Sequence, residues 1–354
     1  MIKCSRQIKW LRSAAVFCCT LLLLFNGCRP KSTANTAFYS WKTVFKLDNK
    51  ETELLRDAAN NHLYLRFFDV VWNRQGHQAL PDGVLTVKTP LQGLSVTPVI
   101  YITNQSLQQS SLTEMDSLAF KVNRLADRLA KEHHFAYTNI QIDCDWSVAT
   151  KTKYFAFLRA FKRYNGKPLE ATIRLHQVKY PERTGVPPVD KGLLMFYNMG
   201  KISADLNAGN SIYNEKDAAA YIAALPHYQL PLDVALPLFS WAVQIRDGKV
   251  AQVYAKITVQ DLSNPGNFEA LPAGGGAEPA YRSLKSFYLK GVYVKQGDLF
   301  KFEGMNAGKL TQAAKQVAQY LPLLKNRNII YYELSSASLS SLYAKDIKEV
   351  SAHF

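Results

Sequence analysis

The stretch NIQIDCDWS, residues 139–147, decides how this chain is expected to fold. Its polar and apolar residues alternate, and a period of two residues is typical of a β-strand. The isoleucines and Cys144 share one face, which helices would cover. A polar face on a central strand must look into a wet barrel mouth, and this face carries Gln141, Asp143, Asp145 and Ser147.

Outward from this stretch, strand-like runs recur along the chain, and most of them are separated by segments with helical spacing. With residues 138–146 included, the runs cover 37–45, 62–72, 97–104, 138–146, 169–178, 192–199, 232–241 and 328–335. Apolar residues at helical spacing occupy 49–60, 112–133, 152–164, 217–225 and 307–324. Eight strands with interposed helices predict an α/β fold, a (β/α)8 TIM-type barrel over residues 37–354. An open doubly wound sheet is the alternative, although neither a Gly-x-Gly-x-x-Gly turn nor a P-loop follows a strand.

One segment does not fit the strand–helix repeat. Residues 244–303 hold several strand-like runs and the glycine-rich stretch 270–279, with Gly274-Gly275-Gly276 within it. We therefore expect a small strand-rich insertion between strands seven and eight.

The N-terminus is typical of an export signal. Residues 1–27 combine four basic residues with a short apolar run, 14–25, that is too short to span a bilayer. Gly27-Cys28 resembles a bacterial lipoprotein signal, which implies that Cys28 is lipidated after cleavage and that residues 28–36 form a tether. We expect a location in the bacterial cell envelope, in the periplasm or on the outer surface, with the membrane contacted through the lipid. Plain secretion is the alternative.

Composition excludes several classes of protein. The 354 residues are 47% hydrophobic and 20% charged, with a net charge of +15, as in a globular protein. Five cysteines without Cys-x-x-Cys or metal-type spacing predict no disulfide scaffold, no metal site and no cofactor. The basic residues are dispersed and no nucleic-acid motif is present, so a nucleic-acid partner is not expected.

Polar residues late in the strands are the candidates for function, because TIM barrels carry their sites there. Asp143 and Asp145 would lie about 6–7 Å apart along the strand, which suits acid/base chemistry as well as a structural pairing with arginines. For Arg174 a structural ion pair is favoured over a ligand contact. For His176 a structural hydrogen bond is favoured over proton transfer. Arg66 has the same two alternatives as Arg174, an ion pair or a ligand contact.

Aromatic residues end several strands. Trp41, Tyr197 and Trp241 together favour a platform for pyranose rings, whereas any one of them alone would be read as rim packing. Cys144 points toward the helices and is expected to be a buried, inert thiol.

These motifs resemble the glycoside hydrolase family 18 barrel of chitinases and their non-catalytic relatives. Asp143 and Asp145 fall on the second and third acids of that family's Asp-x-x-Asp-x-Asp-x-Glu strand. Met195, Tyr197 and Asn198 match its Met-x-Tyr-Asp strand with one amide change. The resemblance implies an oligosaccharide or polysaccharide ligand, with Tyr197 and Asn198 among the residues that bind it.

Two departures from the family pattern bear on activity. Ile140 replaces the first acid, and Ser147 replaces the glutamate that donates a proton to the leaving oxygen. A serine hydroxyl is too weak an acid for that role. One hypothesis is a divergent glycan hydrolase in which Asp145 acts as the acid with Glu333 as its partner. The other is a lipid-anchored glycan-binding or scaffold protein without hydrolysis.

Overall fold

A computed structural model describes residues 34–272, 278–336 and 342–354. Ala34–Phe354 form one compact unit by their contacts. The expected signal peptide 1–27, Cys28, residues 29–33 of the expected tether and Gly274-Gly275-Gly276 lie outside the described residues. No described helix has the length and apolar character needed to cross a membrane.

Eight parallel strands close into a barrel. In order around it they are β1 (Ala34–Ser40), β3 (His62–Asn73), β6 (Ser95–Ile102), β7 (Ile140–Asp143), β8 (Leu169–Arg174), β9 (Lys191–Met195), β10 (Leu232–Pro237) and β18 (Arg327–Tyr332). Each pairs in parallel with the next, and β18 pairs with β1 to close the ring. Every predicted barrel strand is present, so the (β/α)8 fold is confirmed.

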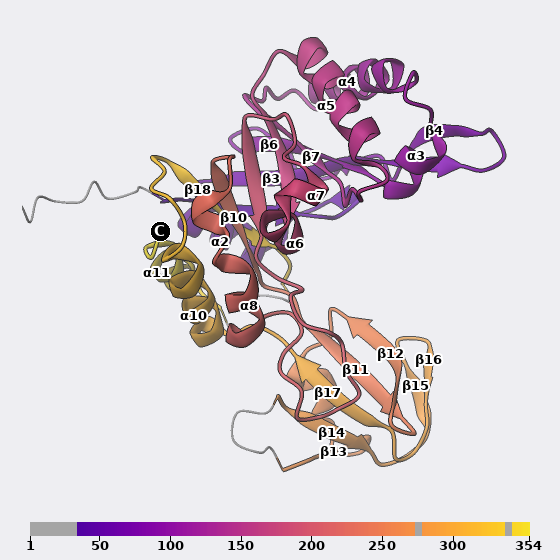
Figure 1. Cartoon of the computed structure of the whole chain (residues 1–354). Coiled ribbons are helices and arrows are strands. Elements are labelled where there is room, and N and C mark those ends of the chain that lie inside the picture. The colour runs from indigo at the N-terminus through magenta and orange to yellow at the C-terminus, as the bar shows by residue number, and fades with distance from the viewer. Residues whose placement is uncertain (1–33, 273–277, 337–341) are drawn as a thin grey trace, which may run out of the picture. The chain divides into compact units, whose positions relative to one another are not determined.

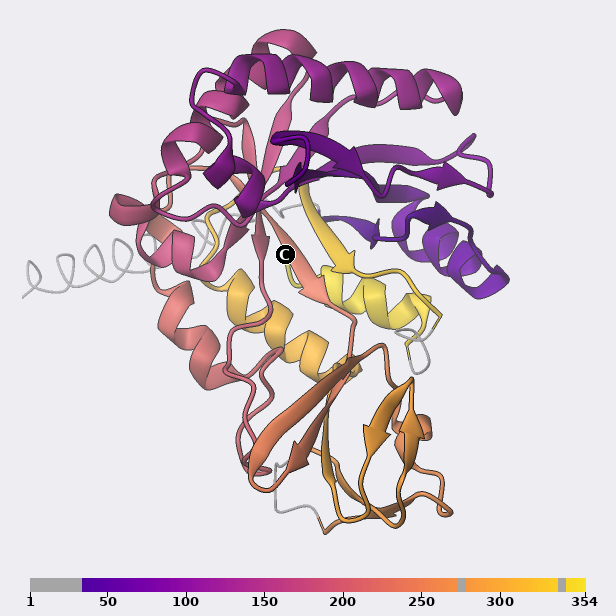
Figure 2. The same ribbon diagram turned by 90° about the vertical axis from the view of Figure 1, so that its right-hand side faces the viewer.

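Helices cover the outside of the barrel (Figures 1 and 2). The five predicted helices are α2 (Asn49–Ala59), α4 (Met115–Glu132), α5 (Lys151–Asn165), α8 (Glu215–Ile222) and α10 (Ala307–Ala318). The start of α2 is set by Asp48, whose side chain accepts from the backbone N–H of Glu51 at 2.9 Å. Helices that we did not predict are α3 (Asn104–Gln109), α6 (Leu175–Lys179), α7 (Pro181–Thr184), a 3₁₀ turn (Leu225–His227) and α11 (Ala344–Ser351).

Several strand ends differ from the prediction. Strand one ends at Ser40, and the short β2 (Val44–Phe45) instead pairs with β5 (Thr86–Val87). Strand one also begins three residues early, because Ala34 to Thr36 pair with β18 rather than continuing the tether. An extra strand, β4 (Gln78–Asp82), pairs antiparallel with the last residues of β3. The expected boundaries are therefore wrong at both ends of strand one.

Strands five and seven are also shorter than predicted. The chain turns into α6 directly after Arg174, because the Gln177 side chain accepts from the Arg174 N–H at 2.7 Å. His176, which the predicted strand 169–178 includes, therefore lies on a helix and not in the strand. Strand seven ends at Pro237, and Trp241 begins a strand of the insertion instead.

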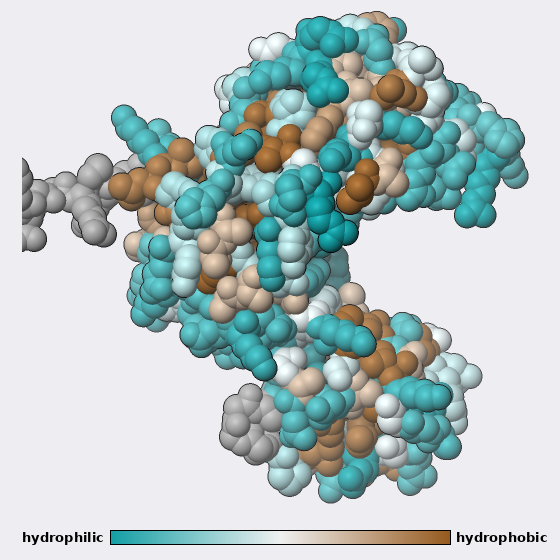
Figure 3. All heavy atoms as spheres, viewed as in Figure 1, coloured by the Kyte–Doolittle hydropathy of each residue, from teal (hydrophilic) through white to brown (hydrophobic). Residues whose placement is uncertain are grey.

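The segment between β10 and β18 forms a lobe. Its five-stranded antiparallel sheet has the order β12 (Lys249–Ala255), β11 (Trp241–Arg246), β17 (Leu299–Glu303), β14 (Ala280–Ser283) and β13 (Phe268–Ala270). A short helix, α9 (Val259–Leu262), and the hairpin of β15 (Phe287–Leu289) with β16 (Val292–Val294) complete it. Tyr254, Phe268 and Phe300 belong to its own hydrophobic core, and Figure 3 shows further apolar surface over the lobe.

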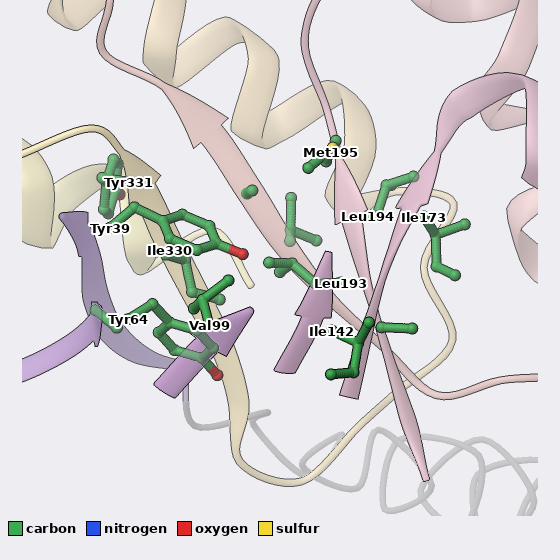
Figure 4. Close-up of a cluster of buried hydrophobic side chains, with 14 of the residues drawn as sticks. Tyr39, Tyr64, Val99, Ile142, Ile173, Leu193, Leu194, Met195, Ile330 and Tyr331 are labelled. Atoms are coloured by element: carbon green, nitrogen blue, oxygen red, sulfur yellow. The ribbon is translucent and has the colours of Figure 1, made fainter. Parts of the chain in front are cut away.

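The barrel interior is not purely aliphatic. Figure 4 shows Tyr39 and Tyr64 within the buried cluster, alongside aliphatic side chains such as Val99 and Ile330. The Tyr39 hydroxyl donates to the buried amide oxygen of Gln141. A tyrosine buried in a barrel needs such a polar partner, so the interior contains a polar network that reaches from strand to strand.

Candidate functional site

A pocket of about 440 Å³ opens at the carboxyl ends of the barrel strands. The volume suits a small ligand such as one or two sugar rings. It brings together eight of the ten residues that we selected from the sequence for catalysis or substrate binding. Its lining consists of Tyr39, Trp41, Tyr101, Asp143, Asp145, Arg174, Met195, Tyr197, Asn198, Phe239, Ser240, Trp241, Ala255, Lys256, Tyr332 and Glu333.

Aromatic rings from four strands meet around Tyr332, which follows from its place at the end of β18. Tyr332 stacks on Tyr197, with ring centroids 5.7 Å apart and planes at 23°. Phe239, Trp41 and Tyr39 each meet it edge-on at 5.9, 5.9 and 5.6 Å. Because the rings pack on one another, they form a preorganised apolar wall rather than independent side chains.

Trp241 is fixed from the side of the lobe by a buried charge pair. Its Nε1 donates to Glu303 Oε2 at 2.8 Å, and Glu303 also accepts from the N–H of Ser211 at 3.0 Å. The Lys301 ammonium lies 2.8 Å from Glu303 Oε1, and both side chains are 0% exposed. Burial alone would raise the pKa of Glu303, but the hydrogen bonds from Lys301, Ser211 and Trp241 outweigh it and lower the pKa. The carboxylate therefore stays ionised as an anchor for the indole.

Asp143 is the carboxyl group with the perturbed acidity. It is the last residue of β7, is buried, and accepts from the Thr172 hydroxyl at 2.6 Å. Burial raises its pKa to about 7, against the opposing Thr172 hydrogen bond, and the charge of Asp145 adds to the increase. Near neutral pH, Asp143 can therefore hold or release a proton.

Asp145 is engaged at both oxygens. It lies just beyond the strand, where Arg174 Nε donates to its Oδ1 at 2.5 Å and Nη2 to its Oδ2 at 2.6 Å. This two-pronged geometry is the strong form of an arginine–carboxylate pair. The structural ion pair favoured for Arg174 is present, and Asp145 has no oxygen left without a partner.

Glu333 is held from the lobe. Its Oε1 lies 2.7 Å from the ammonium of Lys256, which follows β12. Its Oε2 is buried and accepts no hydrogen bond from any described residue. The Lys290 ammonium donates to the backbone oxygens of Ala255 and Lys256 at 3.2 and 2.7 Å, which holds the backbone at the end of β12 beside the pocket.

Two predicted ligand contacts lie outside this pocket. Arg66 pairs with Asp69 at 2.8 and 2.6 Å, and its guanidinium lies 5.9 Å from the Trp41 ring, so it supports the wall from behind. His176 instead lines an adjoining pocket of about 400 Å³. Burial and the nearby Arg174 charge lower the pKa of His176. The two pockets share Asp145, Arg174, Tyr197 and Asn198.

Ser147 has no catalytic geometry. Its N–H donates to Thr150 Oγ1 at 2.9 Å, and the two hydroxyl oxygens are 3.2 Å apart, just before α5 begins. It lines the adjoining pocket and not the aromatic one. The residue at the position of the family's proton donor therefore serves the start of a helix.

Our prediction omitted residues of two kinds. Tyr39, Phe239 and Tyr332 end strands as aromatic residues do elsewhere in the chain, so the signal used for Trp41 applies to them as well. Lys256 carries no such signal, because only the folding of the lobe brings it to Glu333. Cys144 is buried and burial raises its pKa, as expected for an inert thiol. The described residues hold no group of three or more metal-binding side chains.

Comparison with known proteins supports the fold. No protein-family model and no curated protein matches the sequence. Among solved structures, a chitinase from Chromobacterium violaceum ATCC 12472 matches with a TM-score of 0.53 at 12% identity, over 90% of this chain and 99% of that chain. The Bacillus cereus spore cortex-lytic enzyme SleL matches with a TM-score of 0.55 at 13% identity, over 92% of this chain and 75% of that chain. A chitinase, RmChi1, from Rhizomucor miehei matches with a TM-score of 0.51 at 12% identity, over 89% and 99%. The chain therefore has the barrel fold of these chitinases, which confirms at the level of the fold its resemblance to glycoside hydrolase family 18.

Proposed function

We propose that the protein is a glycoside hydrolase-like barrel that binds a carbohydrate in the aromatic pocket without cleaving it. The observation that carries the proposal is the wall of rings around Tyr332 beside the carboxylates of Asp143, Asp145 and Glu333. Sugar rings stack on aromatic faces, and their hydroxyl groups donate to carboxylate and amide oxygens. The similar folds named above belong to chitinases and a spore cortex-lytic enzyme, which supports the same ligand class by analogy of fold.

The geometry opposes hydrolysis at two points. The Ser147 hydroxyl is too weak an acid to serve as the proton donor, and it lies outside the aromatic pocket. The pair nominated from the sequence, Asp145 with Glu333, is also poorly suited, because Arg174 takes both oxygens of Asp145 and Lys256 takes one of Glu333. A general acid needs a proton to give and a free approach to the leaving oxygen.

Hydrolysis is the second candidate, and one observation favours it. Burial raises the pKa of Asp143 to about 7, which is the range that suits a general acid near neutral pH. In such an enzyme Asp143 would supply the proton that Ser147 lacks.

Binding and turnover can be measured on the same samples. The full chain in detergent would be titrated with a panel of oligosaccharides by calorimetry and then analysed for products by mass spectrometry. We expect binding without products, and we expect Trp241→Ala to weaken it by about 10-fold or more, as for loss of a buried aromatic contact. Tyr288→Ala is the matched control, because Tyr288 is an exposed aromatic of the lobe outside the pocket.

Two other results would contradict binding without cleavage. Products that disappear in Asp143→Asn would establish the second candidate. A wild-type chain that binds no oligosaccharide of the panel would contradict both candidates.

We further propose that the protein is exported and anchored to the membrane of the bacterial cell envelope by a lipid on Cys28. The support is the sequence of residues 1–28. Growth with a labelled fatty acid should label the wild-type chain and leave Cys28→Ser unlabelled and released from the membrane fraction. Label retained by Cys28→Ser would contradict the anchor.

A further inference from the structure

We propose that the carbohydrate carries a free, protonated amine, and that Glu333 receives this ammonium group in the aromatic pocket. This inference rests on the proposed function and narrows the ligand to an amino sugar whose nitrogen is not acylated. Three properties of the pocket lead to it: its paired cations, a carboxylate oxygen without a hydrogen bond, and the aromatic rings that line the pocket together with Glu333.

The charge balance of the lining leaves no cation for an acidic sugar. The lining has three carboxyl groups and two cations, and both cations are already paired. Arg174 is bound to both oxygens of Asp145, and Lys256 is bound to Glu333. The lining therefore has no free cation for an acidic ligand, and it favours a ligand that supplies hydrogen-bond donors or a positive charge.

The net charge of +15 on the whole chain does not reverse this balance. Charges in solvent act over about 8 Å at physiological salt, whereas the carboxylates of the pocket contact the ligand directly.

Glu333 supplies an acceptor that nothing in the described chain uses. The residue is only 4% exposed, and its Oε2 is shielded without a hydrogen bond from any described residue. A buried acceptor without a partner is costly, and native structures seldom leave one unless a ligand or water completes it. An ammonium group brings three donors and a positive charge, so it satisfies this oxygen better than a hydroxyl group does.

The aromatic wall favours the same group. Tyr332, which precedes Glu333, meets Trp41, Tyr197 and Phe239 at centroid distances below 6 Å. Faces of electron-rich rings attract cations, and the attraction grows when water is excluded. Aromatic rings and the carboxylate of Glu333 line the same pocket, which suits an ammonium group carried on a sugar ring. An acetyl group on the nitrogen would remove the charge that both features recognise.

Lys256 shows that an ammonium group fits at Glu333. Its Nζ lies 2.7 Å from Oε1, while its side chain is 57% exposed and hence free to swing away. A ligand ammonium that displaces Lys256 takes this place, and the charge of Lys256 opposes it. Removing that charge should therefore strengthen the binding of an amine more than that of a neutral ligand.

The test uses matched oligosaccharides that differ only at the nitrogen. The full chain in detergent would be titrated at pH 6 with oligomers of glucosamine, oligomers of N-acetylglucosamine of equal length, and an oligouronate. We expect glucosamine oligomers to bind about 10-fold or more tightly than the other two, which is about 1.4 kcal/mol. Added salt should reduce this preference, since it depends on charge.

Two variants locate the preference. Glu333→Gln keeps the shape of the side chain and should remove most of the preference, because it weakens the binding of glucosamine oligomers far more than that of the acetylated oligomers. Lys256→Met should bind glucosamine oligomers several-fold more tightly, and Lys249→Met, an exposed lysine of β12 outside the pocket, is its matched control. Thermal melting of each variant shows whether it is folded, and Lys256→Met serves as the readout if Glu333→Gln is not.

The outcomes separate this inference from the proposed function. Equal or tighter binding of the acetylated oligomer or the oligouronate contradicts the inference that the ligand carries a free amine, but it is consistent with a carbohydrate-binding barrel. A preference for glucosamine that survives in Glu333→Gln, or that Lys256→Met does not strengthen, overturns the role of Glu333. No binding of any oligomer to the wild type overturns the proposed function itself.

Discussion

The two ends of the barrel both bury carboxyl groups, but they treat them differently. At the amino ends of the strands, Glu170 accepts from Asn139, Gln141 and Tyr64 at 2.7, 3.2 and 3.1 Å. There too, Asp233 accepts from Lys191 at 3.0 Å and from the N–H and side chain of Asn328 at 2.8 and 3.0 Å. At the carboxyl ends, by contrast, Glu333 has one exposed partner and an oxygen that accepts no hydrogen bond from the described part of the chain.

This difference distinguishes a structural network from a binding site. A carboxylate whose oxygens are all satisfied inside the protein has no bond left to offer a ligand, and its role is to hold strands together. A buried oxygen left open beside aromatic rings can still make one. Tyr39 and Gln141 join the two ends, since Tyr39 lines the pocket while Gln141 bonds to both Tyr39 and Glu170.

The largest expected contrast comes from removing one acid at each end. Asp233→Ala removes a buried acceptor and leaves the half-buried Lys191 ammonium and the Asn328 N–H without it, so we expect the free energy of unfolding to fall by about 3 kcal/mol. Glu333→Gln should cost about 1 kcal/mol or less, because its partner Lys256 is solvated. Urea denaturation measures both. Equal losses would mean that Glu333 is as structural as Asp233.

The same contrast explains what the sequence could predict. The period of two in 139–147 and the seven similar runs were enough for all eight strands and for the polar mouth of the barrel. Strand ends were harder, because they depend on single contacts. One is the Gln177 side chain that turns the chain into α6 after Arg174, and it moves His176 off the strand.

The contacts that the lobe makes with the pocket could not be predicted from the sequence pattern. Trp241 was selected as the end of a barrel strand, yet it begins β11 and reaches the pocket from the lobe. Lys256 reaches Glu333 across 77 positions of sequence, and no local pattern indicates which cation will arrive there. The pairing of Asp145 with Arg174 was foreseeable, because both lie near the ends of neighbouring strands.

A second prediction concerns pH and Asp143. The folded protein keeps this proton up to about pH 7, whereas the unfolded carboxyl releases it near its usual value of 3.8. The folded state thus binds more protons between these values, and the free energy of unfolding must fall as pH rises through this window. A pKa difference of about three corresponds to roughly 4 kcal/mol.

Asp143→Asn isolates that contribution. The amide oxygen can still accept from Thr172 but cannot ionise, so the loss between pH 4 and pH 8 should be smaller in the variant. Glu170, with its pKa raised to about 7 by burial, and His62, with its pKa lowered to about 4 by burial, act equally in both proteins and cancel in the difference. Parallel stability curves for wild type and variant would show that Asp143 ionises normally in the folded state.

The smallest expected effect tests whether the lobe holds the pocket wall in place. Trp241→Phe keeps an aromatic ring but loses the N–H that donates to Glu303 at 2.8 Å. Glu303 retains Lys301 and Ser211, and the lost hydrogen bond is only partly buried, so we expect about 1 kcal/mol of lost stability, as for one ordinary hydrogen bond. The ring, however, loses the contact that sets its orientation, so the ligand affinity of the folded variant should fall several-fold. Phe239→Leu is a useful contrast, because Phe239 packs 5.4 Å from Trp241 without touching the charge pair. If Trp241→Phe binds ligand as tightly as the wild type, the buried pair of Lys301 and Glu303 serves only to join the lobe to the barrel. Its role would then be structural, like that of the hydrogen-bonded carboxylates at the amino ends of the strands.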